Sequence, residues 1–197
     1  MSLYNTELSR GSLMTLESKR IASLLLTKPD ETEWKKAIEK ENILQKDTVG
    51  TAIRQAKLIQ KRLNTLDAHG WELIAQKEIE VSNQLLFAAA IKQNKLLGEF
   101  MRSVYIGRQK ALESAIQVSN WEDFLIECSH HDSSVAEWNE NTKLKILNGI
   151  CRILTEAKYL ADKKTMKLTP KSLHPVVRAY LLERKEKFLL ECLERVK

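Results

Sequence analysis

The chain has 197 residues, of which 29% are charged and only 6% aromatic, and it contains six glycines and three prolines. That length supports one substantial core or two small ones without disulfides or metal. The residue mixture, rich in Leu, Ala, Glu, Lys, Ile and Gln, favours helix over strand. The longest apolar run, residues 85–91, is far shorter than the roughly 20 residues that cross a bilayer. We therefore expect an all-α, compact, multi-helix globular protein.

Cysteine usage and the N-terminal residues indicate the compartment. Cys128, Cys151 and Cys192 are odd in number, widely spaced and each set in an apolar helical pattern. This usage argues against a disulfide framework and fits a reducing environment. The first ten residues are polar and lack an apolar stretch followed by a cleavage site, so we do not expect them to act as a signal peptide. We expect a cytoplasmic monomer that binds no membrane, metal or cofactor.

The net charge of +6 is a mild bias toward polyanionic partners. Residues 1–70 carry 12 Lys or Arg against 9 Asp or Glu, residues 71–132 carry 6 against 9, and residues 133–197 carry 14 against 8. Positive charge is therefore gathered toward the two ends. We accordingly expect an N-terminal helix-turn-helix-like unit (1–70), buried central helices (71–118) and a C-terminal winged-helix-like unit (119–197), packed as one globule.

The N-terminal part predicts three helices. The first covers residues 12–26, with Leu16 on its apolar face and with Lys19 and Arg20 left toward water. Asp30 and Glu33 have the spacing of a capping box, which starts a second helix that runs to about residue 44. After a turn at 45–50, a third helix covers residues 51–66. Its core stripe recurs with helical spacing at Ile53, Ala56, Ile59, Leu63 and Leu66.

The remaining helices follow with short breaks. A break at 68–70 precedes helical pattern through the apolar run 85–91, which extends to about residue 117 as more than one helix because Gly98 and Gly107 weaken it. Helices start at Ser119 and, briefly, at 134–137. A long helix follows the turn at 139–142 and ends near residue 161, with Leu144 in its apolar stripe. Residues 162–170 suit a two-stranded wing, and His174-Pro175 opens a last helix toward residue 196.

The third helix is the first candidate DNA-binding surface, because a helix and a short turn precede it as in a helix-turn-helix reader. Arg54, Lys57, Lys61 and Arg62 lie at i, i+3, i+7 and i+8, which puts them on one face opposite the apolar stripe. A major groove admits such a helix, and each cation placed on a phosphate releases a counterion. The alternative is the solvated face of an ordinary amphipathic helix.

The long helix and the wing are the second candidate surface, and together they resemble a winged helix. Lys143, Lys145, Asn148 and Arg152 lie at or near the exposed side of the helix, whose free amides at the amino end also attract phosphate. Four lysines would decorate the wing: Lys163, Lys164, Lys167 and Lys171. The alternative is one continuous helix over 134–161 whose lysines only keep the protein soluble.

The sequence gives little support for a metal site, a catalytic site or base-stacking aromatic residues. His130 and His131 are adjacent and would point in different directions on a helix, and no second ligand pair occurs at zinc spacing, so a surface turn explains them better than a metal site. The sequence has no phosphate-cradling glycine loop, nucleophile elbow or paired-carboxylate motif, and we expect no enzyme. The tryptophans fall near helix starts with apolar neighbours, which favours core anchoring over base stacking.

The opening string Tyr4-Asn5-Thr6-Glu7-Leu8-Ser9-Arg10-Gly11-Ser12-Leu13-Met14, followed by Glu17-Ser18 and the apolar run 21–26, resembles the BrxA family of BREX bacteriophage-exclusion systems. Thr142-Lys143-Leu144 and Leu173-His174-Pro175-Val176 are similar to that family as well. The resemblance implies a component of a bacterial defence locus that distinguishes self from phage DNA by methylation, beside methyltransferase and ATPase subunits. It also implies a helical binder of double-stranded DNA with helix-turn-helix elements, and it assigns no contact residue.

These observations predict a non-catalytic protein that binds double-stranded DNA mainly through phosphates and meets other BREX subunits. Sequence preference should be weak, because few Asn, Gln or Arg side chains are aligned to read base edges. Two alternatives stay open. One is a scaffold that docks onto partner proteins through an apolar or acidic surface, and the other is an RNA-binding helical module.

Overall fold

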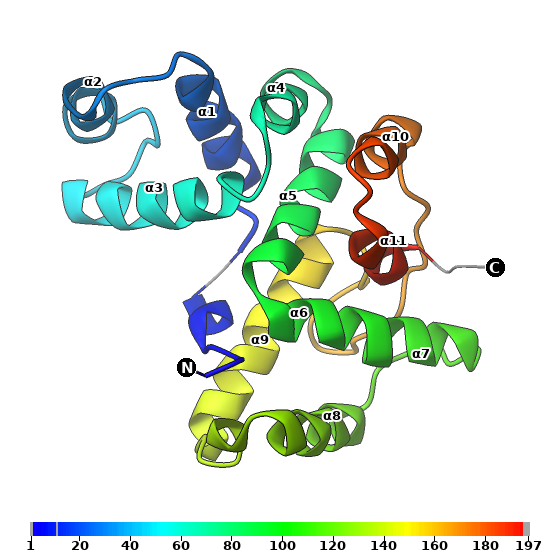
Figure 1. Cartoon of the computed structure of the whole chain (residues 1–197). Coiled ribbons are helices and arrows are strands. Elements are labelled where there is room, and N and C mark those ends of the chain that lie inside the picture. Colours follow the sequence, from blue (N-terminus) through cyan, green and yellow to red (C-terminus); the bar gives the residue numbers. More distant parts are fainter. Residues whose placement is uncertain (1, 11, 195–197) are drawn as a thin grey trace. The chain divides into compact units, whose positions relative to one another are not determined.

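The structure, a computed structural model, describes residues 2–10 and 12–194, and these residues form helices and no regular strand (Figure 1). The all-α prediction is confirmed. The chain divides into a small unit, residues 13–89, and a large unit, residues 1–12 with 90–197. These boundaries differ from the three consecutive segments that we expected, because the first residues of the chain pack with its C-terminal half.

The small unit is built around three helices whose apolar faces meet. Its elements are α1 (Thr15–Leu26), α2 (Glu31–Lys35), the π-helical turn η2 (Lys36–Lys40), α3 (Val49–Leu63), α4 (Ala68–Gln76) and the greater part of α5 (Ile79–Gln93). Helix α1 packs on both α3 and α4. Ile21, Ile59 and Ile74, one from each of these helices, have no exposed surface. Burial of apolar area of this kind is the main stabilising contribution to such a core.

Capping side chains set where the helices of the small unit begin. The capping box is confirmed: Asp30 accepts a hydrogen bond from the Glu33 amide (2.8 Å), and Glu33 accepts one from the Asp30 amide (2.9 Å). The second helical segment ends at Lys40 and not near residue 44, because the chain turns at Asn42, which has a positive φ of 47°. The break predicted at 68–70 is wrong, since Asp67 accepts from the Gly70 amide (2.9 Å) and those residues form the first turn of α4.

Lys19 does not face water as predicted. Its ammonium donates to the main-chain oxygens of Ile74 (2.9 Å) and Lys77 (2.5 Å) at the carboxyl end of α4. These carbonyls have no partner within their own helix, so the lysine closes the helix end. Partial burial lowers the pKa of Lys19 from its ordinary value. Leu16, which we placed on the apolar face of the same helix, is 60% exposed.

The large unit holds the remaining helices. They are η1 (Glu7–Arg10), α6 (Lys95–Glu99), the π-helical η3 (Phe100–Tyr105), α7 (Ile106–Lys110), α8 (Val118–His131), the 3-10 turn η4 (Ser133–Val135), α9 (Glu140–Glu156), α10 (Pro175–Glu183) and α11 (Lys187–Leu193). Segments α6, η3 and α7 follow one another without a gap (Figure 1). Gly98 and Gly107 therefore lie inside continuous helix, and the prediction that they divide it is wrong. The preceding interruption falls at Asn94, whose side chain accepts from the Leu97 amide (3.2 Å).

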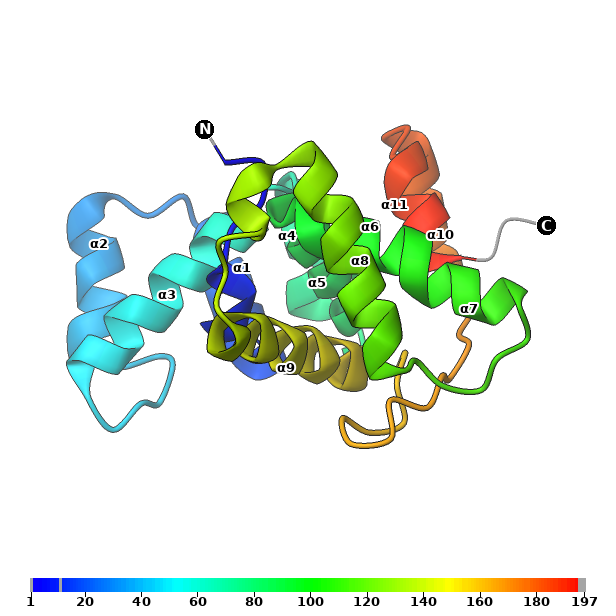
Figure 2. The same ribbon diagram turned by 90° about the horizontal axis from the view of Figure 1, so that it is seen from below.

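The alternative of one helix over residues 134–161 is wrong. The turn η4 separates α8 from α9, as Figure 2 shows, and the Asn139 side chain starts α9 by accepting from the Thr142 amide (2.8 Å). Helix α9 ends at Glu156. The last predicted helix is also divided, into α10 and α11, because Lys185 has a positive φ of 57°. Leu144, placed in the apolar stripe of α9, is 57% exposed.

Burial follows the sequence prediction in the middle of the chain. Each residue of the apolar run 85–91 is at most 2% exposed. The cysteines are free, as expected, and burial raises the pKa of the Cys128 thiol to about 12, that of Cys151 to about 11 and that of Cys192 to about 12. A thiol with such a pKa is protonated and unreactive at neutral pH. No helix of the described residues is long and apolar enough to span a membrane.

The N-terminal segment is tied to α9 by close backbone packing. An ideal Cβ placed on Gly149 would lie only 2.0 Å from the main-chain oxygen of Leu8, so the main chain of η1 occupies the space where any other residue would have a side chain. The Asp132 carboxylate accepts from the Leu3 and Tyr4 amides (2.6 and 3.1 Å) and holds the segment in place. Hydrogen bonds, led by that from Ser134, hold the pKa of Asp132 well below its ordinary value.

Replacement of Gly149 by alanine tests this packing. We expect Gly149→Ala to lower the free energy of unfolding by about 3 kcal/mol, because backbone atoms of η1 must move away from α9. Gly107→Ala in α7 is the matched control, since nothing lies within 4 Å of its Cβ position; it should stabilise the protein by about 0.5–1 kcal/mol through its higher helix propensity. Urea unfolding followed by circular dichroism measures the stability of both variants. Equal stability of the two would contradict the close packing of the η1 main chain on Gly149.

Candidate nucleic-acid interface

Helix α3 presents a cationic face in the small unit. The Thr48 side chain starts the helix by accepting from the Thr51 amide (3.2 Å). Its buried stripe includes Ala52, Ala56, Ile59 and Leu63, while Ile53 is half-buried. Arg54, Lys57 and Lys61 are exposed, as predicted, and we call them the α3 face. Neither Arg54 nor Lys57 makes an ion pair with a described residue.

Arg62 does not belong to this face. Its side chain is 3% exposed, and its Nη1 lies 3.5 Å from the main-chain oxygen of Leu13. Eight residues advance an α-helix by about 80° beyond two full turns, which turns Arg62 away from Arg54 and toward the buried stripe. The prediction that Arg62 shares the exposed face of Arg54 and Lys57 is therefore wrong, and Arg62 is no longer a candidate contact. The i+8 spacing rule counts this residue as part of the same face. The angle of about 100° per residue would instead have placed Arg62 at the edge of the core.

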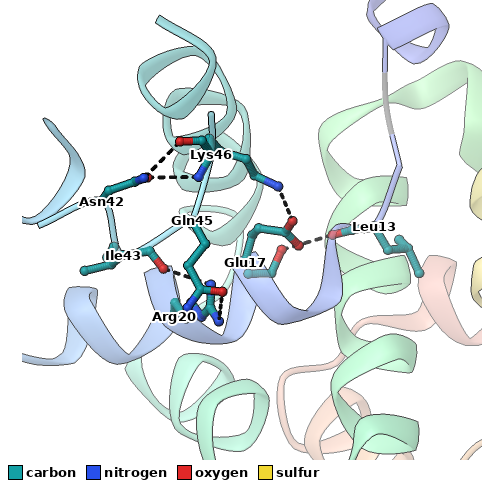
Figure 3. A network of polar contacts seen from close by, with 8 residues as sticks. Leu13, Glu17, Arg20, Asn42, Ile43, Gln45 and Lys46 are labelled. Atoms are coloured by element: carbon teal, nitrogen blue, oxygen red, sulfur yellow. Dashed lines mark hydrogen bonds and ion pairs between the residues drawn. The ribbon is translucent and has the colours of Figure 1, made fainter. Parts of the chain in front are cut away.

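The loop that precedes α3 is held by polar contacts with α1, which Figure 3 shows. Lys46 makes an ion pair with Glu17 (2.5 Å), and both side chains are 21% exposed. Arg20, predicted to face water, donates to the main-chain oxygen of Ile43 (3.0 Å) and to the Gln45 side chain (2.9 Å). Residues 41–48 thus form a braced connection, which is longer than the 3–4 residues usual in a helix-turn-helix.

Helix α9 presents the second cationic surface, in the large unit. Its buried side chains include Ile146, Ile150 and Leu154. Lys145, Asn148 and Arg152 are exposed and share the opposite side, since they lie three and four residues apart. Neither Lys145 nor Arg152 makes an ion pair with a described residue.

Lys143 differs from the other predicted cations of α9. Its ammonium lies 2.7 Å from the Glu140 carboxylate, and its side chain is only 28% exposed. The positive charge is therefore largely neutralised by a carboxylate one turn earlier in the same helix. Lys143 lines an apolar groove between α8 and α9, which also includes Leu144. We accordingly remove Lys143 from the candidate contacts.

The segment after α9 is a hydrogen-bonded loop and not a wing of two regular strands. Two isolated antiparallel bridges hold it, one between Leu160 and Leu168 and one between Ala115 and Lys167. At its tip, the Asp162 carboxylate accepts from the amides of Lys164 and Thr165 (both 2.8 Å). These bonds use the polar groups of a turn and leave its lysine side chains to solvent.

The loop lysines have unequal exposure. Lys163, Lys164 and Lys167 are exposed and make no ion pair with a described residue, whereas Lys171 is half-buried and has a polar or electrostatic partner. Lys163 is close enough to Cys151 on α9 to counteract part of the rise in the pKa of that thiol. Lys158, which sequence reasoning missed because it was assigned to the helix, is also exposed at the start of the loop. We call the following set the α9–loop surface: Lys145, Arg152, Lys158, Lys163, Lys164 and Lys167.

No alternative chemistry emerges from the described part of the chain. It contains no group of three His, Cys, Asp or Glu side chains that could hold a metal ion. His130 and His131 are exposed at the end of α8. Trp121 is 4% exposed and packs edge-on against Phe100, with 5.9 Å between ring centroids, which supports core anchoring for this tryptophan.

The fold and these surfaces define a basic, all-helical protein of two units. A family model described as BrxA matches residues 2–185. The chain is 34% identical to the BREX protein BrxA of Paramagnetospirillum magneticum (97% of this chain, 96% of the relative) and 32% identical to that of Escherichia coli O9:H4 (95% and 88%). A crystal structure of an uncharacterized protein from Magnetospirillum magneticum superimposes with a TM-score of 0.87 at 32% identity, over 98% of this chain and 99% of the other. The chain belongs to the BrxA family of BREX phage-defence systems.

Removal of the Lys46 ammonium tests the brace before α3. We expect Lys46→Met to lower the free energy of unfolding at pH 7 by about 1–2 kcal/mol, because a partly buried carboxylate loses its charged hydrogen-bond partner. Lys35→Met is the control, since Lys35 and its partner Glu31 are largely exposed; it should change the free energy of unfolding far less than Lys46→Met does, because solvent screens an exposed ion pair.

The effect of Lys46→Met should depend on pH. Although partial burial raises the pKa of Glu17, the bond from Lys46 and further contacts outweigh it and lower the pKa below the ordinary 4.5. The pair therefore stabilises the folded state above pH 4.5, and that contribution is lost as the pH falls through the lower folded value. Urea unfolding should show the gap between wild type and Lys46→Met closing in acid. A gap that does not change with pH would contradict the role of Glu17.

Proposed function

We propose that this protein is a non-catalytic component of its defence system that binds duplex DNA through phosphate contacts. The observation that carries the proposal is the α9–loop surface, where six exposed cations are gathered and none makes an ion pair with a described residue, although Asp162 lies near enough to Lys164 to interact with it electrostatically. The α3 face supplies further exposed cations in the small unit. Family membership supports a role beside other BREX subunits.

The distinction between paired and unpaired cations is central to the proposal. A lysine that already holds a carboxylate gains little from a phosphate, because it must give up its first partner. Lys92, Lys95 and Arg178 are held in this way by Glu186, Glu99 and Glu194. Unpaired lysines and arginines can neutralise phosphates at no such cost, and each contact releases a condensed counterion.

The residue types of the α9–loop surface favour phosphate contact over base reading. Four of its six members are lysines of a loop or of its start, and lysine acts as a point charge without a fixed pairing geometry. On α9, Lys145 and Arg152 are seven residues apart, about 10 Å along the axis, which spans roughly three base pairs of duplex. Asn148 and Arg152 are the exposed side chains of α9 best suited to base edges. We therefore expect weak sequence preference.

Salt dependence of binding tests the proposal. Combined neutralisation of the loop lysines in a Lys163→Gln, Lys164→Gln, Lys167→Gln variant should reduce the slope of log affinity against log salt by about 2.7, since each phosphate contact contributes about 0.9. Affinity should fall uniformly across duplex sequences. Fluorescence anisotropy with a labelled duplex measures both quantities.

The matched control removes three positive charges that are already paired, in a Lys92→Gln, Lys95→Gln, Arg178→Gln variant. Its slope should change by less than about 1. If the two variants changed the salt slope equally, binding would depend only on the overall net charge and not on the α9–loop surface. Absence of duplex binding by the wild type at low salt would remove it altogether.

A further inference from the structure

The large unit contains an apolar groove that duplex DNA does not account for. Helix α8 forms one wall, and the first two turns of α9 form the other, with the turn η4 at the end that joins them (Figure 2). The groove has a volume of about 510 Å³. Its walls carry three large apolar side chains that stay more than half exposed: Val118 (55%), Ile126 (57%) and Leu144 (57%). Clustered exposed apolar side chains mark a contact surface.

The spacing along α8 suits a helical occupant. Lining residues recur at Val118, Trp121, Leu125 and Ser129, which is one face of the helix over about 16 Å. A groove between two helices with an apolar floor accepts the apolar face of a third helix, whose anchors follow i, i+3, i+4 and i+7. About three turns of such a helix match the length of this groove.

Charge decides what kind of helix fits. Residues 111–142, which include all of α8 and η4 and the start of α9, contain seven Asp or Glu and no Lys or Arg, in a chain that has 32 Lys and Arg. Glu122 and Glu140 line the groove, and the one cation that lines it, Lys143, is bonded to Glu140. A surface of this sign repels phosphate and attracts a cationic partner.

We propose that this groove binds a basic amphipathic helix of a partner protein, with apolar anchors between α8 and α9 and with Lys or Arg beside Glu122 and Glu140. Exposed Leu144 and Ile126 would cover the anchors from the two walls. The acidic carboxylates would speed encounter and exclude acidic helices, while apolar burial would supply most of the affinity. The proposal does not depend on DNA binding.

The probe is a labelled synthetic peptide of about 18 residues, with Leu at i, i+3, i+4 and i+7 and Lys on the flanks, added to the full chain and followed by fluorescence anisotropy. A second peptide carries Glu in place of every Lys. We expect the basic peptide to bind at least about tenfold more tightly than the acidic one. Similar affinities of the two peptides would overturn the charge argument and the proposal with it.

Variants on the two walls test the site itself. Leu144→Asp and Ile126→Asp should each weaken the basic peptide at least about tenfold, because each places a carboxylate among the anchors. Both side chains are exposed, so the fold should survive, which thermal melting checks. Leu182→Asp on α10, where the leucine is 48% exposed, is the matched control and should change affinity less than about twofold.

Two further measurements distinguish a partner-helix site from a DNA-binding site and from a dimer interface. Duplex affinity should be unchanged in Leu144→Asp. An equal loss of DNA and peptide binding would contradict the claim that the groove is separate from the DNA-binding surface. Sedimentation should show a monomer for the wild type. A dimer that Leu144→Asp dissociates would instead assign the groove to a second copy of this chain and overturn the partner-helix proposal.

Discussion

An α-helix can turn only one side toward an apolar core, and this constraint decides which cations of this protein meet solvent. In α3 the burial of Ala56, Ile59 and Leu63 forces Arg54 and Lys57 outward. In α9 the burial of several isoleucines and leucines does the same for Lys145 and Arg152. The packing of η1 against Gly149 adds a second constraint, because it fixes the N-terminal segment on α9 without covering those cations. The exposed charge is thus a consequence of how the cores pack.

Sequence periodicity predicted these faces because periodicity is a local property. The Asp30–Glu33 capping box and the buried run 85–91 depend on neighbours within a few residues, and both are confirmed, whereas the apolar spacing is confirmed in part, since Leu16 and Leu144 are exposed. Long-range partners could not be predicted in the same way. Lys19 reaches carbonyls more than fifty residues away, and only the fold brings them together.

Errors at the candidate site have specific physical causes. Lys143 was misplaced because a carboxylate three residues earlier neutralises it, which charge counts over long segments do not register. Arg62 was misplaced because a spacing of eight residues is further from two full turns than a spacing of seven. The loop after α9 lacks regular strands because its main chain shares its hydrogen bonds between residues 159–161 and 114–116.

Helix α9 contributes to two surfaces of opposite character. Its first two turns line the acidic, apolar groove, whereas Lys145, Arg152 and the following loop form the cationic surface. DNA binding and scaffolding, which the sequence left as alternatives, can therefore be proposed for separate surfaces of the same unit. A basic protein gains from such a division, because a cationic partner helix and a phosphate backbone need surfaces of opposite sign.

The most direct measurement of the central claim is lysine acetylation of the protein with and without a duplex, quantified residue by residue by mass spectrometry. The account predicts that duplex DNA protects Lys57 on α3 together with Lys145, Lys163, Lys164 and Lys167, while Lys35 and Lys92, which are paired with carboxylates, react equally in both states. Protection that is absent at low salt, or that falls equally on the paired lysines, would contradict it.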